Sequence, residues 1–245
     1  MKRVDGRMKL GVIGGLGPGA TAYFLELVIK MTNAHCDQEH LDMIIYNCPS
    51  IPDRTDYILG RSKDNPVIAM TNIGKKLFEQ GVAYIAIPCI TAHYFHEQLS
   101  SEIMVPIIDM VKETVLHLKR SGINLVGITA TDGTVASGVF QKELSEAGIE
   151  YVLPSKKSQQ IIMDIIYKQI KAGEPPNMDK FMEVSQELRN NGAQVIILGC
   201  TELSLIKRDY RLGAGYIDAL EVLAKASILS CNRLLKKQYE SLITT

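Results

Sequence analysis

The sequence lacks the features that mark membrane, secreted and nucleic-acid-binding proteins. No stretch approaches the roughly 18 consecutive apolar residues of a membrane span. The N-terminal segment 1–7 is charged and has no long apolar core of the kind found in a signal peptide. The 27 basic and 27 acidic residues cancel, and no block of like charge suggests a basic patch or tail. We therefore expect a cytoplasmic protein that binds neither nucleic acid nor a membrane.

The cysteines also lack the spacing of a disulfide scaffold or a zinc ribbon. Their number is odd and no two form a C-x-x-C pair. In a reducing compartment neither framework is expected, and we expect no metal ion. The cysteines are then core residues or reactive thiols, and their settings must decide which. They stand at positions 36, 48, 89, 200 and 231.

What the sequence does contain is a regular alternation of short β-branched runs and longer amphipathic stretches. The 245 residues suffice for one large or two small domains with a buried core. This alternation predicts an α/β fold with mostly parallel sheets. The expected strands cover 10–13, 43–46, 83–87, 106–109, 124–129, 151–153, 194–198 and 216–218. The expected helices cover 21–32, 67–80, a segment from 97, 110–120, 135–147, 158–172, 179–190 and 219–237.

The second part of the chain repeats the pattern of the first. In both parts a helix ends at a glycine, a buried strand follows, and a cysteine comes eight positions after the glycine. Each repeat therefore puts a cysteine at the carboxyl end of a parallel strand, the edge where open α/β sheets bind ligands. If the halves face each other, the two thiols meet across one cleft. The repeated segments are 81–91, with Cys89, and 192–202, with Cys200.

Two opposed thiols suit one reaction, the racemisation of an amino acid. One group must remove the Cα proton on one face while another returns a proton to the other face, and a thiolate and a thiol can share these roles. Each cysteine precedes a predicted helix, whose free N–H groups would stabilise a thiolate. A single strand-end cysteine is most often a small buried hydrophobe. Two cysteines in register weaken that interpretation for Cys89 and Cys200, whereas Cys36, Cys48 and Cys231 are expected to be structural.

Four segments resemble motifs of the aspartate/glutamate racemase family, and the resemblance spans about residues 9–230. Segment 88–93, P-C-I-T-A-H, resembles its P-C-N-T-A-H motif, and segment 199–202, G-C-T-E, is the same as its second cysteine motif. Segment 11–22 resembles the glycine-rich opening G-I-x-G-G-M-G-P-x-A-T-A, and segment 131–140 resembles the turn that opens the second half. The combination is similar above all to the aspartate racemase branch.

The resemblance implies two pseudo-symmetric α/β domains with the active site between them. We expect the first to comprise residues 1–110 plus 218–245 and the second to comprise residues 111–217. The family also implies a cofactor-independent racemase of aspartate or glutamate, free of pyridoxal phosphate and metal, and a homodimer. Its motifs make Cys89 and Cys200 the acid and base. The expected substrate contacts are Gly15, Arg54, Ile90, Thr91, Thr131, Thr134, Gln160, Thr201 and Glu202.

Individual contacts remain open between a functional and a structural role. Arg54 matches the family arginine that binds the side-chain carboxylate, and a guanidinium can bind such a group bidentately; from sequence it could equally be a surface residue after a proline turn. Thr91 and Thr201, with nearby N–H groups, are expected to hold the substrate carboxylate and the developing carbanion. Glu202 is expected either to cap a helix or to bind the substrate ammonium.

Two positions depart from the family pattern. Ile90 replaces an asparagine whose amide contacts substrate, and Gln160 aligns with a lysine that binds the second carboxylate in aspartate racemases. A lost buried polar contact costs roughly 1–3 kcal/mol. Weak activity, another amino acid as substrate, or a catalytically inactive amino-acid-binding protein are therefore alternatives. The sequence does not say which cysteine serves which enantiomer.

Further alternatives come from single motifs. Segment 15–20 fits the G-x-G-x-x-A dinucleotide fingerprint, but the second strand lacks the acidic residue that binds ribose, so the glycines are expected to approach a substrate carboxylate instead. His93 and His96 lie beside Cys89 and could form a metal site, although we expect His93 to orient or tune the thiol and His96 to lie on the surface. Asp109 and Asp218 end corresponding strands and are expected to cap helices.

Overall fold

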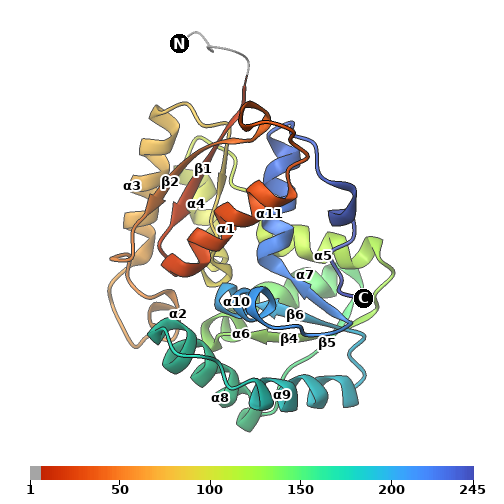
Figure 1. The fold of residues 1–245 in the computed structure, drawn as a ribbon. Helices are drawn as coiled ribbons and strands as arrows, with labels where there is room; N and C mark the ends of the chain where they lie inside the picture. The colour runs from red at the N-terminus through yellow and green to blue at the C-terminus, as the bar shows by residue number, and fades with distance from the viewer. Residues whose placement is uncertain (1–6) are drawn as a thin grey trace.

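The structure, a computed structural model, describes residues 7–245 and contains two parallel β-sheets (Figure 1). The first has the strand order β2-β1-β3 and the second the order β5-β4-β6-β7. Parallel strands need long crossovers, which the helices between them provide. This arrangement confirms the predicted α/β fold with two helix-flanked sheets. The strands are β1 (Lys9–Gly14), β2 (Asp42–Asn47), β3 (Tyr84–Ala86), β4 (Leu125–Ala130), β5 (Glu150–Val152), β6 (Val195–Gly199) and β7 (Tyr216–Asp218).

The helices alternate with the strands along the chain. The α-helices are α1 (Pro18–Met31), α2 (Arg54–Ile58), α3 (Pro66–Glu79), α4 (His96–Glu102), α5 (Met110–Arg120), α6 (Asp132–Ser137), α7 (Val139–Ala147), α8 (Lys156–Asp164), α9 (Met178–Asn190), α10 (Thr201–Asp209) and α11 (Ala219–Ser230). Shorter 3₁₀ turns cover Asp37–Glu39, Ile90–Phe95, Ile170–Ala172 and Lys237–Tyr239, and a π-helical turn covers Ile165–Gln169.

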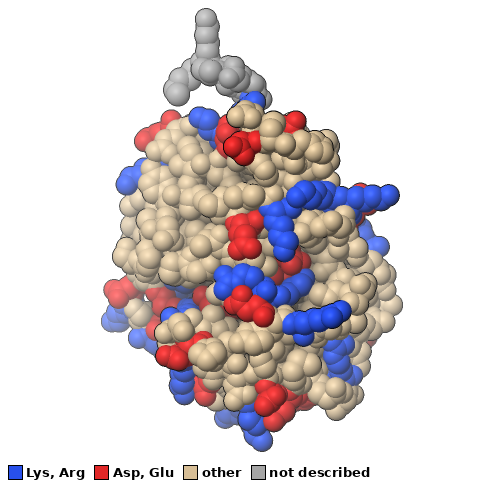
Figure 2. Space-filling view, viewed as in Figure 1, with Lys and Arg blue, Asp and Glu red and all other residues tan. Residues whose placement is uncertain are grey.

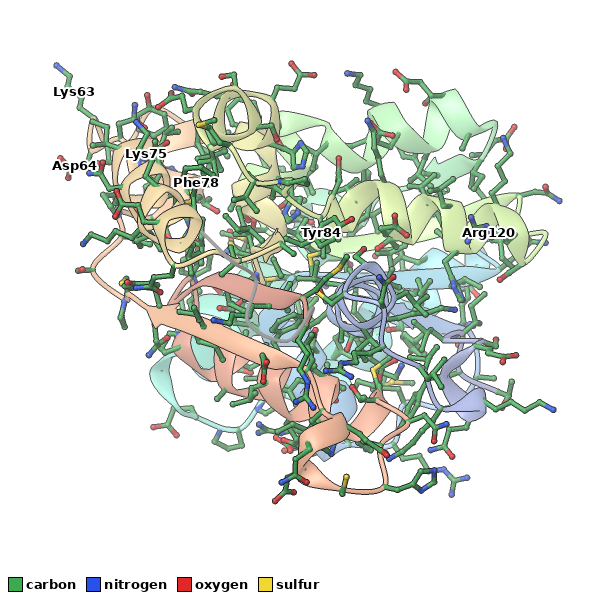
Figure 3. All side chains as sticks on the ribbon, turned by 90° about the horizontal axis from the view of Figure 1, so that it is seen from above. Lys63, Asp64, Lys75, Phe78, Tyr84 and Arg120 are labelled. Carbon is green, nitrogen blue, oxygen red and sulfur yellow. The ribbon has the colours of Figure 1, made fainter. Side chains whose placement is uncertain are left out.

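The two halves share a hydrophobic core. One buried cluster includes Leu10 and Val12 of β1, Val126 of β4, and side chains from α1, α5, α7 and α11. A second cluster lies between the first sheet and α3 and α4, and a third lies between the second sheet and α8, α9 and α10. In Figure 1 α11 runs between α1 and α5, and it contacts both. In the perpendicular view of Figure 3, Phe78 of α3 and Arg120 of α5 lie toward opposite sides of the molecule.

The backbone repeats in the two halves as the sequence predicts. The segments after α3 and α9 pass through Gly81 and Gly192, whose φ angles of 73° and 93° are in the left-handed region that favours glycine. The strands that follow, β3 and β6, each pair with the first strand of their own half, β1 and β4. Both cysteine-bearing segments therefore leave a sheet at its carboxyl edge.

Four expected elements differ from the structure. The helix expected at 158–172 is α-helical only to Asp164 and continues as a π-helical turn and a 3₁₀ turn. The helix expected at 135–147 is divided into α6 and α7 at Gly138, which has a φ of 69°. The C-terminal helix α11 ends at Ser230 because the chain turns through Asn232, with a φ of 56°. The strand expected at 106–109 contributes one parallel bridge, between Ile85 and Ile107. Helix α2 was not predicted at all, and it begins at Arg54.

Two features of the surface bear on membranes and on charged partners. Among residues 7–245 no helix is long and apolar enough to cross a membrane. On the face drawn in Figure 2, acidic and basic side chains are interspersed over the surface.

Candidate active site

Cys89 and Cys200 line the same small pocket, whose cavity volume is only about 10 Å³. Cys89 follows β3 and precedes the 3₁₀ turn Ile90–Phe95, and the helix expected from 97 follows that turn as α4. Cys200 is the N-cap residue of α10. The two side chains are almost equally buried, with 5% and 6% of their surface exposed. The pocket therefore receives one thiol from each half of the repeat, at the carboxyl edges of the two sheets.

The charge beside Cys89 is positive. Arg54 is 7% exposed, and its guanidinium donates to the carbonyl oxygens of Leu16 at 2.8 Å and Pro52 at 3.1 Å, while its Nε has no partner. Burial opposes the charge, but Cys89 and Asp53 beside it raise the pKa of Arg54 above its usual value. The cation is thus held in place by backbone carbonyls and faces a thiol.

The charge beside Cys200 is negative. Its Sγ donates to Oε2 of Glu202 at 2.9 Å, and Glu202 is only 5% exposed. Burial and the Glu202 carboxylate raise the pKa of Cys200 well above its usual value. An anion beside a thiol favours the protonated form and a cation beside a thiol favours the thiolate. The pocket is therefore electrostatically asymmetric, with a cation beside Cys89 and an anion that favours the protonated form of Cys200.

Four buried threonine hydroxyls join the two halves on one wall of the site. The hydroxyl of Thr131 lies 3.3 Å from that of Thr55, 3.1 Å from that of Thr91 and 3.1 Å from that of Thr134. Thr91 and Thr134 are 2.9 Å apart. Hydroxyls can rotate to donate or accept, so this cluster offers several donors to a carboxylate. Of the expected contacts, Thr91 and Thr131 line the pocket directly, and Thr134 lies behind them.

A lysine and a tyrosine of the second half, Lys171 and Tyr167, also line the thiol pocket. The Nζ of Lys171 lies 3.6 Å from the Asp53 carboxylate and 4.0 Å from the centre of the Tyr167 ring. The Tyr167 hydroxyl donates to Asp53 at 3.3 Å, and burial raises its pKa to about 12. Burial opposes the charge of Lys171, but Glu202, Tyr167 and Cys200 raise the pKa of its ammonium. A second cation therefore lies at the pocket.

A wider outer cleft of about 380 Å³ adjoins the thiol pocket. The two spaces share five lining residues, namely Leu16, Asp53, Arg54, Lys171 and Glu202. Gly15 lines the outer cleft, with a φ of 92°, and a side chain there would overlap the backbone of Cys48. A side chain at Gly17 would reach within 2.5 Å of Oε1 of Glu202. The glycines of this loop therefore make room for Cys48 and Glu202, in addition to lining the cleft.

The structure places Gln160 away from the site. It is exposed and donates to Asp164 at 2.9 Å, because this position faces outward on α8. The adjacent Gln159 points inward, to the carbonyl oxygen of Ala130. The expectation for Gln160 is wrong, and the cation in its place is Lys171, three turns further along. Tyr167 and Lys171 line the pocket from the π-helical and 3₁₀ turns that follow α8, and an α-helical pattern in the sequence gives no signal for them.

The remaining expected residues have the following positions. Ile90 and Thr201 line the thiol pocket, and Ile90 also packs into the shared core. His93 is buried and bonds to the carbonyl oxygen of Cys89 rather than to its sulfur. His96 is half-buried, with its Nε2 3.2 Å from the carbonyl oxygen of Ile107. Within residues 7–245 no three His, Cys, Asp or Glu side chains form a group that could hold a metal ion.

The comparison with known families identifies the chain. A family model described as Asp/Glu/Hydantoin racemase matches residues 13–227. The chain belongs to this racemase family. It is thus an enzyme of the racemase class, an isomerase.

Individual relatives of this racemase agree with that assignment. The structure of an aspartate racemase from Picrophilus torridus superposes with a TM-score of 0.81 at 33% identity, covering 96% of this chain and 99% of that one. The broad specificity amino-acid racemase RacX of Bacillus subtilis is 28% identical over 225 residues, or 89% of this chain and 96% of the relative. A glutamate racemase of Aquifex pyrophilus is 28% identical over 178 residues, covering 72% of this chain and 68% of the relative.

The charge asymmetry predicts different reactivities for the two thiols. Cys89 and Cys200 are almost equally buried, and burial together with the Glu202 carboxylate raises the pKa of Cys200. We expect iodoacetamide at pH 7.5 to modify Cys89 at least about tenfold faster than Cys200, since one pKa unit changes the thiolate fraction about tenfold. Mass spectrometry of the modified peptides measures both rates in one sample.

Glu202→Gln supplies the control. Removing the carboxylate lowers the pKa of Cys200, so its modification should become about 3- to 10-fold faster while that of Cys89 stays the same. The exposed Cys36 reports the intrinsic reactivity of the reagent in each sample. Faster modification of Cys200 than of Cys89 in the parent protein would contradict the asymmetry.

Proposed function

We propose that the racemase interconverts L- and D-aspartate, or glutamate, without a cofactor, using Cys89 and Cys200 as its two proton-transfer groups. The observation that carries this proposal is the joint presence of both thiols and of two cations, Arg54 and Lys171, at one pocket. Two thiols suit proton exchange at a single carbon, and two cations suit a substrate with two carboxylates.

The pocket contains complementary groups for each part of an acidic amino acid. The threonine cluster, with free N–H groups at the start of α10, would hold the α-carboxylate. Glu202 lies between this region and the outer cleft and would bind the ammonium group. Arg54 and Lys171 would bind the side-chain carboxylate, replacing the Asp53 that pairs with Lys171 in the free protein.

Proton transfer then follows from the charges. In one direction the Cys89 thiolate, stabilised by Arg54, takes the Cα proton and becomes a thiol. The electron pair left on Cα delocalises into the carboxylate, which donors of the threonine cluster stabilise. The Cys200 thiol gives its proton to the opposite face of Cα and becomes a thiolate, whose charge the nearby Lys171 ammonium balances. The reverse reaction exchanges the two roles.

Two finer alternatives remain within the family. Ile90 cannot donate a hydrogen bond at the position of the family asparagine, which favours a relaxed choice of substrate or weak turnover. The similarity to a broad-specificity racemase points the same way. A catalytically inactive binding protein would keep the cations and lose proton exchange. The homodimeric state and the cytoplasmic location implied by the family belong to this same proposal.

Proton exchange at Cα tests the function directly. In D₂O the racemase should introduce deuterium at Cα of both L- and D-aspartate, and the optical rotation should decay to zero. With a panel of amino acids at equal concentration, kcat/KM should be highest for aspartate or glutamate, because both cations can pair only with a second carboxylate. Alanine, which lacks that group, is the matched control.

The pattern of results separates the alternatives. Binding of aspartate without deuterium incorporation would establish the inactive binding protein. Equal kcat/KM for alanine, leucine and aspartate would establish a racemase without acidic specificity and would refute the role given to Arg54 and Lys171.

A further inference from the structure

The residue four positions after each thiol is buried and anchored in both halves. His93 follows Cys89 at this distance and is 6% exposed, and Ser204 follows Cys200 at the same distance and is fully buried. Neither lines the thiol pocket. His93 bonds to the first residue of α5, and Ser204 bonds to Asp218, the residue that caps α11. The equivalent placement of two different side chains suggests a common task.

In the first half the anchor is an imidazole. Nδ1 of His93 lies 3.0 Å from the carbonyl oxygen of Cys89 itself, and Nε2 accepts the N–H of Met110 at 3.1 Å. Because a backbone N–H can only donate, Nε2 carries no proton and Nδ1 is the donor. Burial lowers the pKa of His93 below its usual value, which keeps this neutral form. Met110 is the first residue of α5, so the ring links Cys89 to the start of that helix.

In the second half the anchor is a hydroxyl. Oγ of Ser204, on α10, donates to Oδ1 of Asp218 at 2.7 Å. The same oxygen accepts the N–H of Leu220 at 2.9 Å, so Asp218 is the N-cap of α11. Cys200 is the N-cap of α10. The hydroxyl therefore links the helix that begins at Cys200 to the start of α11.

The two helices that receive these anchors pack against each other. Helices α5 and α11 are in contact, and Val111 and Val115 of α5 belong to the same buried cluster as Leu220 and Leu223 of α11. One continuous path thus leads from Cys89 through His93 to α5, across the helix pair to α11, and through Ser204 to Cys200. Because protein cores are close-packed, the contact between α5 and α11 resists displacement of one helix relative to the other.

We propose that His93 and Ser204 are equivalent positioning residues that fix the two thiols relative to each other through the α5–α11 pair. The inference rests on the proposed two-thiol function. Neither residue touches the reacting atoms, and neither transfers a proton. Proton transfer depends steeply on placement, and a displacement of 1 Å can cost about 10²-fold in rate. Loss of one anchor should therefore lower kcat and leave KM nearly unchanged.

Each anchor should also act on its own thiol, which a general loss of stability would not do. Ser204→Ala should speed the modification of Cys200 by iodoacetamide about threefold or more, through local opening, and leave Cys89 unchanged. His93→Gln should do the reverse. Ser204→Thr keeps the hydroxyl and should restore both the rate of modification and kcat toward the parent values.

Two matched variants serve as controls. His117→Gln removes an imidazole in the last turn of α5 that accepts the N–H of Leu242 at 3.2 Å and so bonds to neither cysteine segment. Ser185→Ala removes a buried hydroxyl of α9 that has no hydrogen-bond partner. Both should keep the parent kcat and the parent modification rates. Melting temperatures of all five variants show how far each change affects stability.

The experiment is a crossed comparison of the folded variants by peptide-resolved modification and by kinetics with L- and D-aspartate. We expect kcat to fall about 10- to 100-fold in His93→Gln and in Ser204→Ala, with KM within about twofold. Equal changes at both cysteines in either variant, or no better behaviour of Ser204→Thr than of Ser204→Ala, would overturn the proposal. If the parent protein shows no racemisation, the proposed function fails. The modification rates then still show whether His93 and Ser204 each hold their own cysteine in place. If His93→Gln does not fold, the Ser204 variants decide.

Discussion

Cys89→Ser and Cys200→Ser are each expected to lower kcat for aspartate racemisation by about 10³-fold or more, because a serine hydroxyl can neither form the base nor match the acidity of a thiol near neutral pH. General acid or base groups typically contribute about 10²- to 10⁴-fold. In the proposed mechanism each thiol serves one face of Cα, so neither substitutes for the other. Chiral chromatography of the two aspartate enantiomers over time measures the loss.

The same two variants assign the thiols to the enantiomers. Cys200→Ser keeps Cys89, the thiol beside Arg54 that is proposed to remove a proton. Slow deuterium incorporation should therefore survive in this variant for one enantiomer only. The variant that keeps Cys200 should retain exchange, if any, for the other. The sequence alone left this assignment open, and the deuterium incorporation of the two variants decides it.

Cys231→Ser and Cys36→Ser are the controls for thiol loss. Cys231 is as buried as the two pocket cysteines but lies in the shared core, where burial raises its pKa to about 11, and Cys36 is exposed. Both variants should keep kcat within about twofold, since most substitutions away from a site act on stability alone. A pocket variant that racemises as fast as these controls would refute the two-thiol mechanism.

The sequence was sufficient for the fold because its signals are local. Alternating buried runs and amphipathic stretches define the sheets and helices, and glycines such as Gly81 and Gly192 mark equivalent helix ends. The repeat placed Cys89 and Cys200 at equivalent strand ends, and the carboxyl ends of parallel strands are where open α/β sheets bind ligands. Cys89 and Cys200 could therefore be predicted as site residues from the sequence alone.

The parts that escaped prediction depend on the relative placement of distant segments. Lys171 reaches the pocket only because α8 continues into a π-helical turn and a 3₁₀ turn, which rotate the helical face after Asp164. Alignment with the family pattern placed Gln160 at the position of the lysine that binds the second carboxylate, but Gln160 is exposed to solvent. The roles of Asp53 and Tyr167 likewise need the contact between halves, 114 positions apart in the sequence.

Arg54→Met is expected to lower kcat/KM for aspartate about 10²- to 10³-fold. Truncating one partner of a buried, hydrogen-bonded charge pair costs about 2–5 kcal/mol, and each 1.36 kcal/mol is a factor of ten in rate. Two effects combine: the substrate loses a bidentate partner for its side-chain carboxylate, and the Cys89 thiolate loses the adjacent cation. Arg54→Lys keeps the charge but cannot bond to several carbonyl oxygens at once, so a smaller loss, about tenfold, is expected.

Comparison with alanine separates these two effects. Loss of thiolate stabilisation should slow alanine and aspartate equally, whereas loss of the carboxylate contact should slow aspartate alone, so Arg54→Met should reduce the preference for aspartate. Lys171→Met should reduce the same preference less, because its ammonium already pairs with Asp53 in the free protein. Arg61→Met is the control, since Arg61 is 57% exposed and lies 3.8 Å from Asp56, outside the pocket. If Arg54→Met slows alanine and aspartate by the same factor, Arg54 serves the thiol and not the choice of substrate, and acidic specificity must come from Lys171 alone.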